Sequence, residues 1–110
     1  MELRELEVQL EQAYNGLAEA TRNYRNEAMV VRSREYDLEG AKLDLYREGK
    51  IDGKNQVMRD AQISEILGDD IGWLERSKDD EAEMYLSREL WQLRVDHLSK
   101  VLRIEELLNE

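Results

Sequence analysis

Apolar residues recur at coiled-coil spacing through the first half of the chain. One series keeps strict seven-residue spacing and a second series is interleaved with it, so that thirteen positions stand in unbroken register and eleven of them are apolar. A helix over residues 2–48 is predicted, and its stripe needs a partner helix to cover it. The thirteen positions are Leu3, Leu6, Leu10, Ala13, Leu17, Ala20, Tyr24, Glu27, Val31, Arg34, Leu38, Ala41 and Leu45.

Two charged residues, Glu27 and Arg34, occupy core-type positions of this stripe. In one interpretation their side chains reach solvent or pair with charges on the facing helix. In the other they fix the register of the pair, as single polar core residues do in some coiled coils. The pattern is compatible with both interpretations.

The long helix is expected to end at a turn. Gly49 and Gly53 lie close together, and Asp52-Gly53 is a turn signal. Asn55 is then a candidate N-cap for a short helix over 56–67. Gly68 would close that helix, and a third helix would follow over 71–108. The chain is long enough for one domain, which we assign to residues 1–110.

These elements predict an all-α fold. A short connection between two long helices makes them antiparallel neighbours, so we expect a long helical hairpin with a short helix at the connection. If Tyr46 lies near Ile71, the arginines of the first helix come opposite acids of the third, and Arg34 lies beside Glu83.

The third helix carries more apolar surface than one partner can cover. A first line contains Leu74, Met84, Trp91, Val95, Leu98 and Leu102. Because the hairpin can bury only one line, the second is a candidate self-association surface, and the expected product is a homodimer forming a four-helix bundle. This second line contains Leu86, Leu90, Leu93, His97, Val101, Ile104 and Leu108.

Catalytic chemistry has little support in the sequence. The chain has no cysteine, and its single histidine, His97, falls on an apolar line, where a packed or partly exposed structural role is expected. No serine stands in a recognisable motif with it, and the turn lacks phosphate-loop and calcium-loop spacing. We therefore expect a non-enzymatic protein with no cofactor and no metal.

Acidic residues dominate the charge. The net charge is -10, which opposes direct binding to nucleic acid, and eight acids lie between Glu65 and Glu83. The run Asp79-Asp80-Glu81 is interpreted as a solvated helix face or an early-turn charge; a basic protein partner docking there is the alternative. Without cysteine, a secretory leader or a long apolar run, we expect a cytoplasmic protein that binds no membrane.

At the connection, residues 51–62 (IDGKNQVMRDAQ) resemble a pattern of small acidic helical-hairpin proteins from bacteriophages and prophages. In those proteins a G-K-N turn and a short helix link two long charged helices. The resemblance implies a viral accessory protein near recombination or replication functions, active in the host cytoplasm, and implies no catalytic residues. It also implies a specified tip formed by Gly53, Lys54, Asn55 and Arg59.

The predicted function is protein–protein interaction or scaffolding, with a partner of unknown identity. Trp73 could anchor such a partner at the tip end, whereas Trp91 is expected in the core. The alternative function is an acidic DNA mimic that inhibits a nucleic-acid-binding host-defence enzyme. Candidate partner-binding residues at the tip are Lys54, Asn55, Arg59, Trp73, Asp79, Asp80, Glu81 and Glu83.

Overall fold

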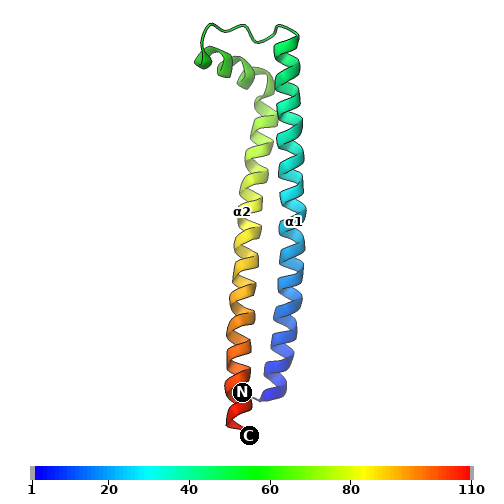
Figure 1. Ribbon diagram of the computed structural model, residues 1–110, viewed down its shortest axis with the longest axis vertical. Helices are drawn as coiled ribbons and strands as arrows, with labels where there is room; N and C mark the ends of the chain where they lie inside the picture. The colour runs from blue at the N-terminus through cyan, green and yellow to red at the C-terminus, as the bar shows by residue number, and fades with distance from the viewer. Residues whose placement is uncertain (1, 110) are drawn as a thin grey trace. The chain divides into compact units, whose positions relative to one another are not determined.

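The computed structural model describes residues 2–109 and is all-α, as predicted (Figure 1). Helix α1 spans Leu3–Arg47 (45 residues) and helix α2 spans Gln56–Leu108 (53 residues), with no strand among the described residues. The chain divides into two compact units, and both helices contribute to each of them. Unit 1 contains Met1–Asn26 and Ala82–Glu110, and unit 2 contains Glu27–Glu81.

The heptad positions of α1 are covered by its partner segment of α2. All thirteen core-type positions between Leu3 and Leu45 are buried or half-buried. Glu27 and Arg34 are both half-buried, so the two polar positions lie in the seam with the apolar ones. Seven-residue spacing keeps these side chains on one face of the helix, where the segment of α2 in the same unit covers them.

Unit 1 has a core at which α1 and α2 run antiparallel. Leu6 and Ala13 are fully buried against Val95 and Leu98. Further along the unit the rings of Tyr24 and Tyr85 meet edge to face, with centroids 5.6 Å apart. The side chains that complete this core are Leu10, Leu17, Trp91, Val101 and Leu102.

Unit 2 has a separate core formed by both helices and the loop between them. Val31, Leu38 and Leu45 of α1 pack with residues of the connection and of α2. Ile51 is buried although it lies outside any helix, so it fastens the loop to the helix ends. The other buried members of this core are Ile63, Leu67 and Leu74.

The predicted break after residue 67 is present as a kink inside one helix rather than as a gap between two. Leu67 has non-helical φ and ψ of -110° and 16°, while α2 continues through Gly68. A glycine that closes a helix usually has a positive φ, and among the described residues only Gly49 does. Leu67 is buried, so the chain bends where an apolar side chain packs and the glycine stays helical.

The predicted pairing of Arg34 with Glu83 is wrong. The Arg34 guanidinium lies 4.8 Å from the ring centroid of Trp73. The prediction began the pairing at Ile71, but Ile63 and Leu67 already pack in the core of unit 2. Because those turns of α2 cover the end of α1, the following residues of α2 in unit 2 are displaced along the seam, and Trp73 lies at Arg34.

Candidate protein-binding surface

A stripe of seven exposed positions runs along α2 in unit 1, and we call it the α2 outer line. Its members alternate by four and three residues, the spacing of a coiled-coil seam. A helix turns by about 100° per residue, so these positions lie on the side of α2 opposite to the buried and half-buried residues Trp91, Val95 and Leu98. The α2 outer line consists of Leu86, Leu90, Leu93, His97, Lys100, Ile104 and Leu107.

Five large aliphatic side chains of this line are more than half exposed. The exposed fractions are 61% for Leu86, 66% for Leu90, 64% for Leu93, 56% for Ile104 and 51% for Leu107. Scattered exposed leucines are ordinary, but several exposed aliphatic residues that share one side of a helix mark an interaction site. The line therefore has the composition of an uncovered helix–helix interface.

The structure changes the membership of the line predicted from the sequence. Leu86, Leu90, Leu93, His97 and Ile104 are exposed, and Leu108 is 75% exposed at the end of α2. Val101 instead packs against the core of unit 1.

Leu107 was missed by the sequence analysis. It follows Leu86 and Leu93 at multiples of seven residues, but Lys100 occupies the intervening position of that series. A seven-residue series that tolerates one lysine would have found it.

Charged residues flank the line and have only weak partners within the chain. Asp96 Oδ1 accepts a hydrogen bond from Gln92 Nε2 at 3.1 Å. Arg103 Nη1 lies 3.8 Å from Glu106 Oε2. These pairs are largely exposed, and such pairs contribute about 0–1 kcal/mol. The flanking charges can therefore exchange partners at little cost.

The predicted tip has a defined hydrogen-bonded loop. Gln62 Oε1 accepts from the backbone N of Asp52 at 3.1 Å and of Gly53 at 2.9 Å, and Gln62 Nε2 donates to Asp52 Oδ1 at 2.6 Å. Arg59 Nη1 donates to the Gly53 carbonyl at 3.2 Å. Asn55 Oδ1 accepts from the backbone N of Met58 at 2.9 Å and so caps α2.

Three of the four residues of the predicted tip, Gly53, Asn55 and Arg59, have a structural role in this network. A Cβ on Gly53 would lie 2.8 Å from the backbone N of Arg59, so the chain passes too closely there for a side chain. Arg59 and Asn55 hold the loop, whereas Lys54 is exposed beside them. Gln62 was not singled out in the sequence, because a glutamine in a polar helix face gives no sign of the loop that it binds.

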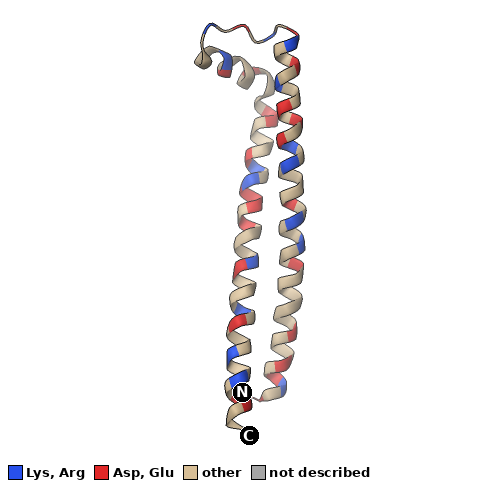
Figure 2. Ribbon diagram, viewed as in Figure 1, with Lys and Arg blue, Asp and Glu red and all other residues tan. Residues whose placement is uncertain are grey.

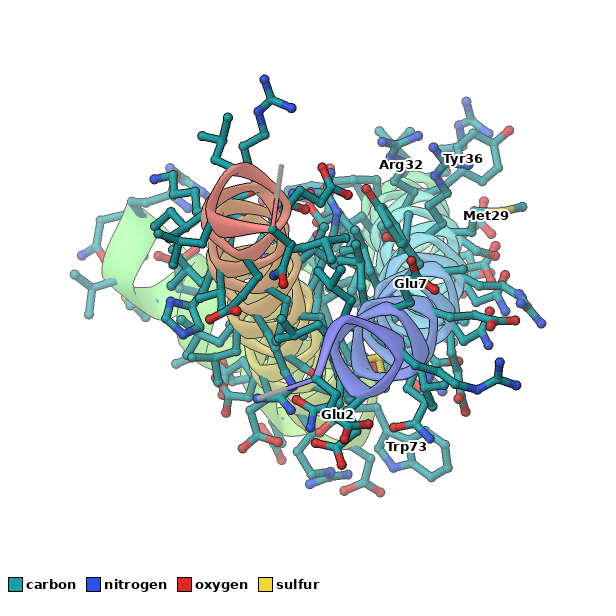
Figure 3. All side chains as sticks on the ribbon, turned by 90° about the horizontal axis from the view of Figure 1, so that it is seen from below. Glu2, Glu7, Met29, Arg32, Tyr36 and Trp73 are labelled. Carbon is teal, nitrogen blue, oxygen red and sulfur yellow. The ribbon has the colours of Figure 1, made fainter. Side chains whose placement is uncertain are left out.

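Trp73 is 55% exposed on α2 in unit 2 and points outward (Figure 3). The Arg34 guanidinium lies over its ring at 4.8 Å, and that of Arg76 lies 5.8 Å from the ring centroid. The Nε atom of Arg34 is buried without a hydrogen-bond partner. Trp73 thus shields the half-buried Arg34, a role that accounts for its position without a partner protein.

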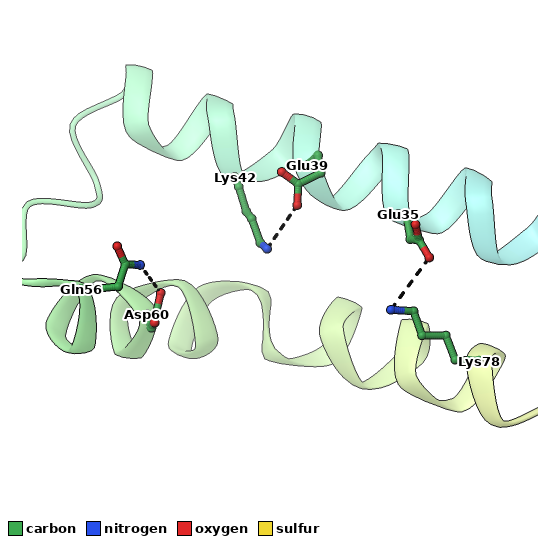
Figure 4. A network of polar contacts seen from close by, with 6 residues as sticks. All are labelled: Glu35, Glu39, Lys42, Gln56, Asp60 and Lys78. Atoms are coloured by element: carbon green, nitrogen blue, oxygen red, sulfur yellow. Dashed lines mark hydrogen bonds and ion pairs between the residues drawn. The ribbon is translucent and has the colours of Figure 1, made fainter.

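The acidic residues of α2 are interleaved with cations (Figure 2). Asp79 and Asp80 are exposed, whereas Glu81 is half-buried at a seam position. Lys78 Nζ lies 3.8 Å from Glu35 Oε1 of α1 (Figure 4). Glu83 is exposed and belongs to unit 1, whereas Asp79, Asp80 and Glu81 belong to unit 2.

Within residues 2–109, no three His, Cys, Asp or Glu side chains are grouped so that they could hold a metal ion. In the same range, neither helix contains a stretch long and apolar enough to cross a membrane. Comparisons with protein-family models, curated proteins and solved structures find no match to the chain.

Proposed function

We propose that this protein is a non-enzymatic interaction protein that works as a homodimer, joined through the α2 outer line. The exposed aliphatic strip from Leu86 to Leu107 carries this proposal. Complete burial of one such side chain contributes roughly 1.5–3 kcal/mol. A second copy covers the part of both strips from Leu90 to Leu107 at once, because a two-fold contact brings the same patch against itself.

The position of the line determines the form of the dimer. It lies on the side of α2 away from the seam, so the second copy meets α2 rather than the groove between the two helices. The four helices of unit 1 and its copy then stand as adjoining hairpins, with the two α2 segments at the centre. This arrangement modifies the closed four-helix bundle expected from the sequence.

Light scattering coupled to gel filtration tests the proposal directly. At micromolar concentration the wild type should have twice the monomer mass of 13.0 kDa. The double variant Leu93→Glu/Ile104→Glu should be monomeric and still helical, because both side chains are exposed in the folded chain. A wild type of monomer mass would overturn the proposed dimer.

A matched control is present on α1 in unit 2. Met29 and Tyr36 are 66% and 81% exposed and project to one side of that helix (Figure 3). The variant Met29→Glu/Tyr36→Glu introduces the same two charges on an exposed apolar face outside the α2 outer line. It should leave the dimer mass unchanged. Loss of the dimer in this control as well would show a general effect of added charge.

The DNA-mimic alternative receives less support from the geometry. Arg76 and Lys78 lie among the acids between Glu65 and Glu83, and Lys78 forms an ion pair with Glu35 of α1. A phosphate-like surface requires a row of negative charges without such cations. The mimic, the viral origin and the cytoplasmic location stay predictions from the sequence and its resemblance.

A further inference from the structure

We infer that the two copies pair through their α2 outer lines in antiparallel orientation, with Leu90 of each copy against Leu107 of the other. This inference rests on the proposed dimer and adds its direction and register. It follows from the order of apolar and charged residues along the line.

The antiparallel register places the aliphatic side chains against one another. Leu90 faces Leu107 of the second copy, and Leu93 faces Ile104 of the second copy. By symmetry each contact occurs twice, so four apolar layers form. All four residues are more than half exposed in the single chain, which leaves this surface free to be covered.

The polar positions of the line are accommodated at the centre of the contact. His97 faces Lys100 of the second copy close to the two-fold axis. The Lys100 stem can lie along apolar surface while its ammonium reaches solvent. Asp96 lies one turn before Lys100 on the same helix, so a negative charge accompanies each lysine.

The flanking charges complement one another in this register. Asp96 comes beside Arg103 of the second copy, and the symmetric pair repeats the contact. Both residues now have only exposed partners on their own helix, Gln92 and Glu106. Opposite charges that flank a helix seam select partner and orientation.

A parallel dimer would bring like charges together. In that orientation each residue of the line faces the same residue of the second copy, so Lys100 would face Lys100. Glu83 lies three residues before Leu86 and continues the same spacing, so Glu83 would face Glu83. A parallel pair would gain a contact between Glu89 and Arg94 of the second copy. That contact lies on the rim, whereas the two repulsive layers lie within the seam, where charges are less screened.

Disulfide trapping separates the two orientations. The chain has no cysteine, so a single introduced cysteine reports one contact. A mixture of Leu90→Cys and Leu107→Cys proteins should form a mixed disulfide, while each variant alone should remain largely uncoupled. Met29→Cys, exposed on α1 in unit 2, is the control and should couple in neither experiment.

Each other outcome has a distinct meaning. Efficient coupling of Leu90→Cys with itself would show parallel pairing and overturn this inference while the dimer stands. A dimer by light scattering with no coupling at either position would place the contact elsewhere and also overturn it. A wild type of monomer mass would overturn the proposed function itself.

Charge reversal gives a second test with intact seam residues. Asp96→Arg should weaken the dimer by about tenfold, because two attractive contacts become repulsive. Mixing Asp96→Arg with Arg103→Asp should restore the wild-type affinity in a heterodimer. Glu89→Arg should have a smaller effect; a tenfold loss with Glu89→Arg and none with Asp96→Arg would overturn the register.

Discussion

The indole ring of Trp91 lies against the backbone of Gly16. A Cβ built on Gly16 would lie 2.6 Å from two carbons of that ring, a distance at which the neighbour must shift. Glycine disfavours helix formation, but at position 16 it leaves room for Trp91, the largest side chain in the core of unit 1.

This contact predicts opposite effects for the two glycines inside α1. Gly16→Ala should destabilise the chain by about 1–3 kcal/mol, because overpacking outweighs the gain in helix propensity. Gly40→Ala should stabilise it by about 0.5–1 kcal/mol, since nothing lies within 4 Å of the added Cβ. Chemical denaturation followed by circular dichroism measures both, and Trp91→Leu should relieve the Gly16→Ala defect.

The loop network predicts a local effect for Gln62→Ala. The variant removes the acceptor of the Asp52 and Gly53 amides, so their hydrogen exchange should accelerate by about fivefold, as expected for the loss of one hydrogen bond worth about 1 kcal/mol at each amide. Gln56→Ala is the control, because Gln56 bonds the side chains of Asp60 (Figure 4) and Arg59 and neither of the two loop amides. Equal amide exchange rates at Asp52 and Gly53 in the two variants would show that Gln62 does not hold the loop.

Arg34 and Arg76 should differ in their contributions to stability. Arg34→Ala should cost about 1–2 kcal/mol, because it removes a half-buried stem and the closer cation–π contact to Trp73. Arg76→Ala should cost about 0.5 kcal/mol or less, since Arg76 is exposed and farther from the ring. Denaturation midpoints compare the two. A larger loss for Arg76 would contradict the shielding role given to Trp73.

Charge reversal at Asp79 and Asp80 tests the mimic hypothesis. Both residues are exposed, so Asp79→Lys/Asp80→Lys should fold with a stability within about 0.5 kcal/mol of the wild type. If apolar docking governs binding, proteins captured from a lysate by the wild type should also be captured by this variant and at raised salt. Loss of the captured proteins under both conditions would favour the mimic instead.

The all-α fold could be predicted because coiled-coil spacing can be read from the local sequence. The positions with this spacing from Leu3 to Leu45 are buried or half-buried in the structure. Trp91 could be predicted in the core for the same reason. The register between α1 and α2 could not be predicted. It depends on how Ile51 and the loop pack and so on where Ile63 lies against α1, and the spacing of apolar residues does not contain this information. Leu107 was missed because a single lysine interrupted its series.

The two cores have no buried residue in common, since one contains Leu6, Ala13, Val95 and Leu98 and the other extends from Val31 to Leu74. Loss of packing in one core removes none of the buried apolar contacts of the other. Sub-global opening of a single core is then a separate equilibrium, with its own free energy below that of global unfolding. One melting temperature would describe such a chain incompletely, because its unfolding need not be a two-state process.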